Sequence, residues 1–184
     1  MMNKEDLRAR MLRQRRALSS TEKVRRDEAI VARLKELPEI QVANVIAGYW
    51  PLLGEVDIRS FLRKCQDQGK AIVLPVPPYR EISVAKMRHF IDESRGFDSS
   101  PFDDVLERTP LAAIEVAIVP IVGFDSSCSR LGRGSGYYDR LIAAQPEITT
   151  IGVAYELQKA TTVPIETHDQ PLDIIITERS VLER

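Results

Sequence analysis

The stretch that decides the fold reads VAIVPIVGFDSSCSRLGRGSGYYDRLI and occupies residues 116–142. Its first seven residues are almost continuously apolar, as in a strand that is buried on both faces. The serine- and glycine-rich residues that follow can continue neither a strand nor a helix. The pattern therefore predicts a buried strand, then an exposed loop, then a helix from about Gly136 to Ala144.

The loop has the composition of an anion-binding site. Gly132, Gly134 and Gly136 permit positive φ, so that successive backbone N–H groups can turn toward one ligand. Arg130 and Arg133 add charge-assisted donors, and the N-terminus of the following helix adds its dipole. The spacing matches neither the six-residue dinucleotide fingerprint nor the phosphate loop that ends in Gly-Lys-Ser/Thr. On composition alone, a phosphate site and an ordinary surface turn both remain open.

Helical and strand patterns alternate along the rest of the chain. A first helix capped by Asn3 is expected, and a second opens at Ser19-x-x-Glu22 and ends at Pro38. The core-facing residues expected in the second helix are Val24, Ile30, Val31, Leu34 and Leu37. A third helix follows Asp57 and ends at Gly69.

Further strands are expected at residues 45–50, 71–74, 82–90, 149–155 and 173–177. Residues 92–110 are acidic and rich in turn formers, which indicates a surface loop, and residues 156–171 read as irregular with a short helix. The alternation predicts an α/β fold: a single three-layer domain over residues 1–184, in which a mostly parallel sheet carries helices on both faces.

Ligands of open α/β sheets bind beyond the carboxyl ends of the strands. The loops at residues 50–55, 75–80 and 123–136, and the segment from residue 155 onward, all follow predicted strands. We therefore expect them to meet at one edge of the sheet, where an aromatic pair, a carboxylate and the glycine loop would form one cleft.

Composition excludes several classes of protein. The 184 residues carry a net charge of −1, which argues against a general nucleic-acid binder, although residues 1–16 hold six basic and two acidic side chains. No apolar run reaches the length of a signal or membrane segment, so a cytoplasmic location is expected. Cys65 and Cys128 have neither metal-binding nor disulfide spacing. Cys128 beside the loop is open to two interpretations, a nucleophile or an ordinary free thiol, and only His89 and His168 exist as histidine bases.

The string Arg-Leu-Gly-Arg-Gly-Ser-Gly-Tyr-Tyr-Asp-Arg at residues 130–140 closely resembles the signature of the 5-formyltetrahydrofolate cyclo-ligase family, also called 5,10-methenyltetrahydrofolate synthetases. The resemblance covers nearly the whole chain and is strongest at its start, at residues 49–55, at residues 130–140 and near Asp169. It implies a ligase of one-carbon metabolism that uses ATP to cyclise 5-formyltetrahydrofolate to 5,10-methenyltetrahydrofolate, with release of ADP and phosphate.

The resemblance also implies a role for each matching position. The residues that match the family's ATP-binding positions are Lys4, Glu5, Asp6, Leu7, Arg8, Arg130, Leu131, Gly132, Arg133, Gly134, Ser135, Gly136, Tyr137 and Tyr138. Those that match its folate-binding positions are Trp50, Glu55, Arg133, Gly134, Ser135, Gly136 and Tyr137. Arg133 and Tyr137 take the catalytic roles, and Asp139 and Asp169 match the magnesium positions.

The implied cofactor is Mg²⁺, with ATP as a co-substrate, and the implied partners are the small-molecule folate and ATP. Neither nucleic acid nor a membrane is expected, and a monomer is slightly favoured over an oligomer. Two other classes stay open from the residues alone. One is a non-catalytic nucleotide- or RNA-binding protein that uses the basic first helix and the glycine loop. The other is a different α/β enzyme that acts on a phosphorylated sugar or a coenzyme A thioester.

Overall fold

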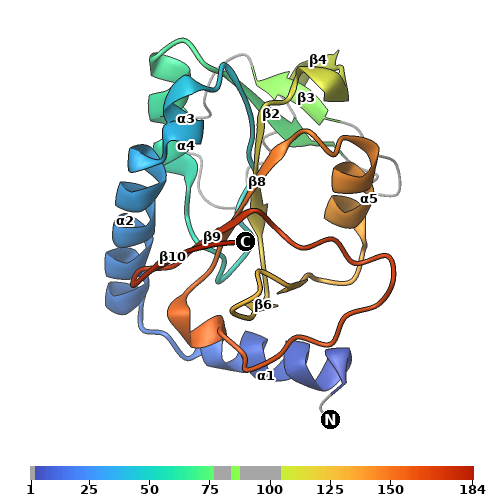
Figure 1. The fold of residues 1–184 in the computed structure, drawn as a ribbon. Helices are drawn as coiled ribbons and strands as arrows, with labels where there is room; N and C mark the ends of the chain where they lie inside the picture. The colour runs from blue at the N-terminus through green and yellow to red at the C-terminus, as the bar shows by residue number, and fades with distance from the viewer. Residues whose placement is uncertain (1–2, 77–83, 88–104) are drawn as a thin grey trace.

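The structure is a computed structural model that describes residues 3–76, 84–87 and 105–184. The strands of its main sheet are, in chain order, β1 (Val45–Ala47), β2 (Ala71–Pro75), β3 (Val84–Met87), β4 (Val105–Thr109), β5 (Val116–Pro120), β8 (Thr149–Val153), β9 (Ile174–Ile176) and β10 (Val181–Glu183). In space their order is β10-β9-β8-β5-β1-β2-β3-β4 (Figure 1). A separate antiparallel pair consists of β6 (Gly123–Phe124) and β7 (Arg130–Leu131).

The centre of the sheet, from β9 through β8, β5 and β1 to β2, is parallel. The outer strands β10, β3 and β4 pair antiparallel with their neighbours. The expected α/β fold with a mostly parallel sheet is therefore confirmed. The parallel strands are short and apolar because both of their faces are covered.

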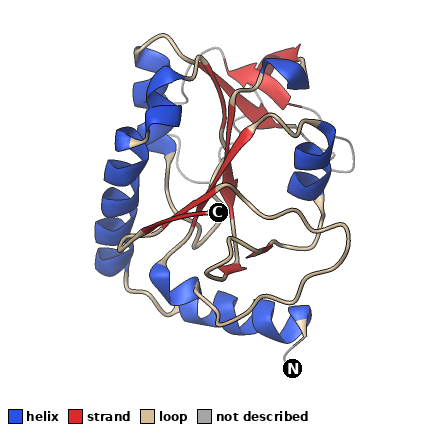
Figure 2. Ribbon diagram, viewed as in Figure 1, coloured by secondary structure: helices blue, strands red, loops and turns tan. Residues whose placement is uncertain are grey.

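The helices are α1 (Lys4–Arg16), α2 (Ser20–Glu36), α3 (Pro38–Val42), α4 (Arg59–Asp67) and α5 (Tyr137–Ala144), with 3-10 turns at Leu111–Ala113 and Glu156–Gln158. Figures 1 and 2 show α2, α3 and α4 on one face of the sheet, α5 on the other, and α1 across one end. The predicted caps are present: Asn3 Oδ1 accepts from the Asp6 N–H at 2.8 Å, and Ser19 and Glu22 form a capping box.

Apolar side chains from alternate strand positions build a separate core on each face. Ile46 and Ile118 pack with Ile30 and Phe61 on the face that α2, α3 and α4 cover. Their neighbours along the strands, such as Ala117, pack on the α5 face. A third cluster joins α1 to the end of the sheet through Leu7, Met11, Val122, Leu131, Ala160 and Val163.

Several sequence-based expectations need correction. Residues 105–109 were expected in a loop, but they form β4, because pairing with β3 supplies hydrogen bonds that the turn-rich composition does not reveal. Residues 92–104 lie outside the described part of the chain. The expected strand at 45–50 ends at Ala47, and helix α3 and strand β10 were not expected. Val24, expected in the core, is 56% exposed because it lies on the outer face of α2.

The connections that follow β1 and β5 determine where a ligand-binding crevice can form. From β1 the chain passes through α4 to β2, whereas from β5 it passes through α5 to β8, on the opposite side. β1 and β5 are neighbours, so the chain leaves their carboxyl ends in opposite directions. Such a reversal opens a crevice between the two following loops. Within the described residues, no helix combines the length and apolar character needed to cross a membrane.

Candidate active site

Two adjoining cavities lie at this crevice. The polar chamber has a volume of about 250 Å³, and charged side chains from α1, the glycine loop and residues 166–169 line it. The apolar chamber has a volume of about 190 Å³ and is lined mainly by aromatic and aliphatic residues. The residues that line both chambers, and so form their common wall, are Glu55, Pro120, Arg133, Ser135, Tyr137 and Tyr138.

The glycine loop borders the polar chamber and leads directly into α5. Gly134 and Gly136 have φ values of 103° and 64°, which a residue with a side chain rarely adopts. A Cβ at Gly136 would also lie only 3.0 Å from Arg140 Nη1. Gly132 does not use positive φ, so two of the three expected glycines have this conformational role. Residues of this loop and of the first turn of α5 line the polar chamber together, as the sequence predicted.

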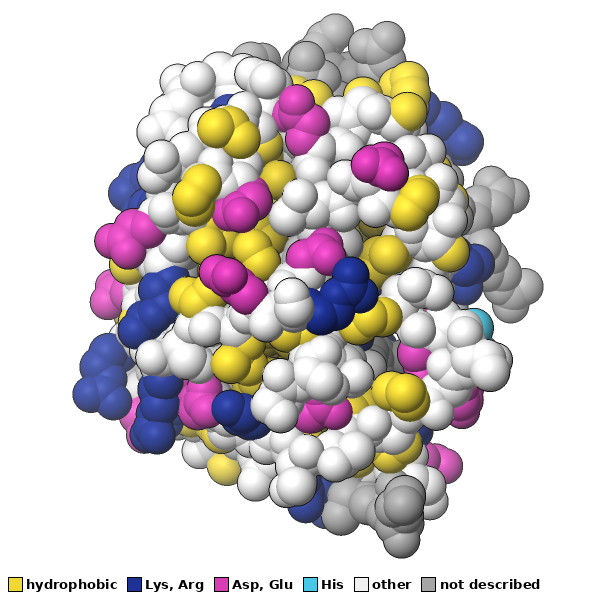
Figure 3. Space-filling model, viewed as in Figure 1, with side chains coloured by type: hydrophobic (Ala, Val, Ile, Leu, Met, Phe, Trp, Pro, Cys, Tyr) yellow, Lys and Arg dark blue, Asp and Glu magenta, His cyan; other side chains and the backbone are white. Residues whose placement is uncertain are grey.

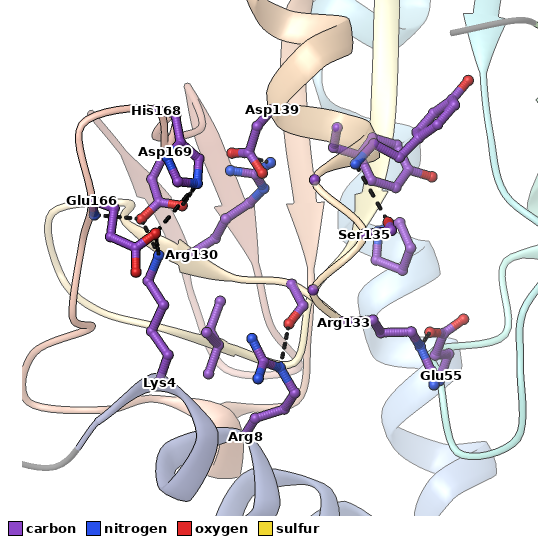
Figure 4. A pocket seen from close by; sticks show the side chains of 17 residues that line it. Lys4, Arg8, Glu55, Arg130, Arg133, Ser135, Asp139, Glu166, His168 and Asp169 are labelled. Carbon is purple, nitrogen blue, oxygen red and sulfur yellow. Dashed lines mark hydrogen bonds and ion pairs between the residues drawn. The ribbon is translucent and has the colours of Figure 1, made fainter. Parts of the chain in front are cut away.

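Helix α1 contributes two cations to the polar chamber (Figure 4). Lys4 Nζ lies 2.6 Å from Asp169 Oδ2 and 3.3 Å from Glu166 Oε2, and Arg8 Nε donates to the Gly132 carbonyl at 3.0 Å. Burial lowers the pKa of Lys4, but the bonds to the two carboxylates outweigh burial, so its pKa is raised. Lys4 therefore stays charged. The other members of the expected ATP-contacting stretch, namely Glu5, Asp6 and Leu7, do not line either chamber.

The two aspartates expected to bind magnesium both line the polar chamber. Asp139 Oδ1 lies 2.9 Å from Arg130 Nη2 and accepts from the Gln170 N–H at 3.1 Å. Burial raises the pKa of Asp169, but the bonds from Lys4 and from the Glu166 N–H, together with the nearby positive charge, outweigh burial, so the pKa is lowered and the group is ionised. Among the described residues, no group of three or more His, Cys, Asp or Glu side chains is placed to hold a metal. Two carboxylates suit magnesium when phosphates and waters complete its coordination.

Glu55 and Arg133 meet on the wall between the chambers. Arg133 Nε donates to Glu55 Oε1 at 2.8 Å, and the Glu55 side chain is 5% exposed whereas that of Arg133 is 43% exposed. The other carboxylate oxygen of Glu55 accepts from the Leu52 N–H at 2.8 Å, and the Tyr49 hydroxyl donates to the Val56 carbonyl at 2.7 Å. The Glu55 loop is thus held at several points. Both residues match folate-binding positions of the family, and Arg133 also matches an ATP-binding position; here they bind each other.

The apolar chamber provides flat ring surfaces. Trp50 lines it, and the Arg59 guanidinium lies 5.7 Å from the centroid of the Trp50 ring. Tyr137 and Tyr138 form an edge-to-face pair with centroids 5.2 Å apart. Aromatic walls beside one buried carboxylate, Glu55, suit a planar ligand that carries hydrogen-bond donors.

Some residues at this edge were not expected from the sequence. Glu166 and His168 line the polar chamber beside Asp169. Arg15 is 4% exposed and lies under the loop that carries Glu55. Its position four residues after Met11, itself four after Leu7, is the signal that would have placed it on the buried face of α1.

The structure also locates Cys128 and part of the expected loop at residues 75–80. Cys128 is fully buried, and burial raises the pKa of its thiol, so it is poorly suited to act as a nucleophile. Of the expected loop at 75–80, Pro75 reaches the apolar chamber, and residues 77–80 lie outside the described residues, as does His89.

The face of the molecule drawn in Figure 3 carries mixed charge. Figure 3 shows Lys and Arg side chains interspersed with Asp and Glu, and yellow apolar side chains scattered between them. This pattern differs from the continuous basic strip that tracks a nucleic-acid backbone.

Comparisons with known proteins agree with one another. A model of the 5-formyltetrahydrofolate cyclo-ligase family matches residues 1–178. The chain is similar to the 5-formyltetrahydrofolate cyclo-ligase of Escherichia coli, with 28% identity over 94% of this chain and 100% of the relative. It is 34% identical to the Mycoplasma pneumoniae protein of the same name, over 96% of this chain and 99% of the relative.

A solved structure is also similar. The NMR structure of Aquifex aeolicus 5,10-methenyltetrahydrofolate synthetase superposes with a TM-score of 0.83 and 32% identity, over 99% of this chain and 93% of the other. The likeness therefore covers the whole arrangement of sheet, helices and loops.

Proposed function

The chain belongs to the 5-formyltetrahydrofolate cyclo-ligase family, and from this premise we propose that its two chambers together carry out the family's reaction. The reaction is the ATP-dependent cyclisation of 5-formyltetrahydrofolate to 5,10-methenyltetrahydrofolate. A nucleic-acid-binding role and an unrelated α/β enzyme activity are not favoured, because the family and its named relatives are cyclo-ligases. A cytoplasmic location is part of the proposal.

ATP is assigned to the polar chamber. Lys4, Arg8 and Arg130 provide positive charge there, and the Gly134–Gly136 turn leads into the N-terminus of α5, where phosphate oxygens are stabilised by backbone N–H groups and the helix dipole. The folate ring system is assigned to the apolar chamber, where Trp50 gives a ring surface and Glu55 accepts hydrogen bonds from the amino-bearing pterin.

The chemistry needs no side-chain nucleophile. The formyl oxygen attacks the γ-phosphorus, an O–P bond forms, and the bond to ADP breaks. The nitrogen at position 10 then attacks the formyl carbon, loses its proton, and phosphate leaves. The protein positions the reacting groups and neutralises the charge on the phosphoryl group. Arg133 and Tyr137 lie on the common wall, where the two ligands would meet.

Asp139 and Asp169 would hold magnesium, whose chemistry is to neutralise phosphate charge. Asp139 orients Arg130 through an ion pair, and Lys4 orients Asp169, so both carboxylates are already held beside the phosphate-binding loop.

The observation that carries the proposal is the shared wall. A charged chamber and an aromatic chamber of this kind bring a nucleotide and a ring-shaped substrate together at Arg133 and Tyr137. The test is to incubate the protein with 5-formyltetrahydrofolate, Mg²⁺ and ATP and to follow the ultraviolet absorbance of the methenyl product. Absence of product with every nucleotide and divalent metal tried would contradict the proposal.

Replacing both Lys4 and Arg8 with alanine is expected to raise the KM for ATP by about tenfold, because two charge-assisted contacts to phosphate are lost. Steady-state kinetics with varied ATP measure this effect, and circular dichroism shows whether α1 persists. Arg13→Ala, an exposed change on the same helix, is the matched control and should leave the KM for ATP unchanged. A lower melting temperature with an unchanged KM would make the first helix purely structural.

Asp139→Asn is expected to raise the Mg²⁺ concentration that gives half-maximal activity by about tenfold, because a neutral amide is a weaker ligand for a hard cation. Activity should recover at high Mg²⁺ by mass action. A magnesium titration of the initial rate measures both effects. Identical titration curves for Asp139→Asn and the parent would remove Asp139 from the proposed magnesium site.

A further inference from the structure

Arg15 is a buried guanidinium that the proposed chemistry does not use. It lies in the last turn of α1 on the same face as Leu7 and Met11, and it is 4% exposed. Within the described parts of the chain, its Nε–H has no hydrogen-bond partner, and no carboxylate forms an ion pair with it. Burying a cation without a close partner costs folding free energy. The charge therefore needs an explanation other than stability.

The guanidinium lies against the loop that carries Glu55. A Cβ on Gly54 would be 3.4 Å from Arg15 Nε, so the missing side chain at Gly54 allows this close approach. Burial lowers the pKa of Arg15, and the nearby Glu55 carboxylate is the largest influence that opposes this. Tyr49 and Tyr155 are also near, but burial raises the pKa of both phenols, which leaves them neutral. Glu55, which follows Gly54 in this loop, is therefore the negative group that acts most strongly on Arg15.

Glu55 consequently has two cations of different character. Arg133 bonds to it directly at 2.8 Å, but Arg133 is 43% exposed and also lines the polar chamber. Arg15 makes no direct bond, but it is buried and lines neither chamber. When Arg133 turns to phosphate, Glu55 loses its ion-pair partner and keeps only the hydrogen bond from the Leu52 N–H. A buried carboxylate that loses its partner is strongly destabilised unless another positive charge stays near it.

We propose that Arg15 is a positioning residue, which holds the Glu55 carboxylate in place for the folate when Arg133 turns to the phosphates of ATP. The inference rests on the proposed function, because it assumes that Glu55 contacts the folate and Arg133 the phosphates. Arg15 acts through Glu55 and contacts neither ligand.

The test compares Arg15→Lys, which keeps the charge, with Arg15→Gln, which keeps polar hydrogen-bonding groups without charge, and Arg15→Met, which keeps bulk. We expect Arg15→Gln and Arg15→Met to raise the KM for the folate about tenfold, with kcat within about threefold and the KM for ATP unchanged. Arg15→Lys should stay within about threefold of the parent, because charge rather than shape is what Glu55 needs. Arg16→Met, at the exposed next position, is the control and should change none of these constants.

A double-mutant cycle separates the inference from the proposed function. In a Glu55→Gln background, Arg15→Gln should lower the folate kcat/KM by less than about twofold, because the group that it positions is already gone. A further loss of about tenfold in that background, or equal losses for Arg15→Lys and Arg15→Gln, would show a packing role and overturn the inference alone. If Glu55→Gln by itself leaves the folate kcat/KM unchanged, the folate site of the proposed function fails, and the inference falls with it.

Discussion

Arg133→Ala is expected to lower kcat by about a hundred- to a thousandfold, because removing a donor that stabilises charge developing in the transition state typically has an effect of this size. Arg133 is placed for such a role because it lies on the wall between the two chambers and its side chain is exposed, so its guanidinium can leave Glu55 for a phosphate oxygen. Single-turnover measurements at saturating ATP and folate isolate the chemical step. High Mg²⁺ should not restore the rate, in contrast to Asp139→Asn.

Two further variants sharpen this result. Arg133→Lys keeps the charge but not the planar fork of donors, so it should retain part of the lost rate. Arg179→Ala, an exposed arginine that lines neither chamber, should behave as the parent. If Arg133→Ala changes only the KM for ATP and leaves kcat intact, Arg133 binds the nucleotide equally well in ground and transition states and has no catalytic role.

Glu55→Gln is expected to lower the folate kcat/KM by about a hundredfold, because hydrogen bonds to a buried charged group are worth about 1.5–3 kcal/mol. The KM for ATP should change by less than about twofold, since the proposal assigns this carboxylate a contact with the folate and none with the phosphates. Initial rates with each substrate varied in turn measure the two effects separately.

The matched control for Glu55→Gln is Glu147→Gln, the same chemical change at an exposed position outside both chambers. An unchanged folate kcat/KM in Glu55→Gln would place this carboxylate outside the folate site. A rise of the KM for ATP as large as the loss with folate would instead indicate that its bond to Arg133 is what matters.

Sequence patterns were sufficient to predict the structure of segments whose conformation depends on residues close together in the chain. The passage from strand to loop to helix at residues 116–144 follows from an apolar run, alternating glycines and a new helix start. The meeting of the loops after β1 and β5 follows from the general rule for parallel sheets. For these reasons the glycine loop and the loop that carries Trp50 and Glu55 line the two chambers, whereas Lys4, Arg8 and Asp169 were expected there only from the family resemblance.

Other features depend on partners far away in the chain, so local patterns could not predict them. β4 is a strand because β3 lies beside it, not because its neighbours have strand-like composition. The bond between Arg133 and Glu55 joins residues 78 positions apart, and the local sequence around one residue does not identify the other as its partner. Arg15 was overlooked because an arginine on a basic helix reads as exposed, although its spacing from Leu7 and Met11 places it on the buried face.

The place of α1 has a consequence for synthesis on the ribosome. The ion pair between Lys4 and Asp169 joins residues 165 positions apart, and the apolar cluster in which α1 packs includes Ala160 and Val163. Helix α1 is thus synthesised before the residues that it packs against, and part of its buried face stays uncovered until residues 122–163 have been made. A polypeptide that ends before residue 160 contains the glycine loop but lacks Asp169 and part of the apolar cluster that holds α1 beside that loop. We expect such a truncated chain to bind ATP more weakly than the 184-residue chain.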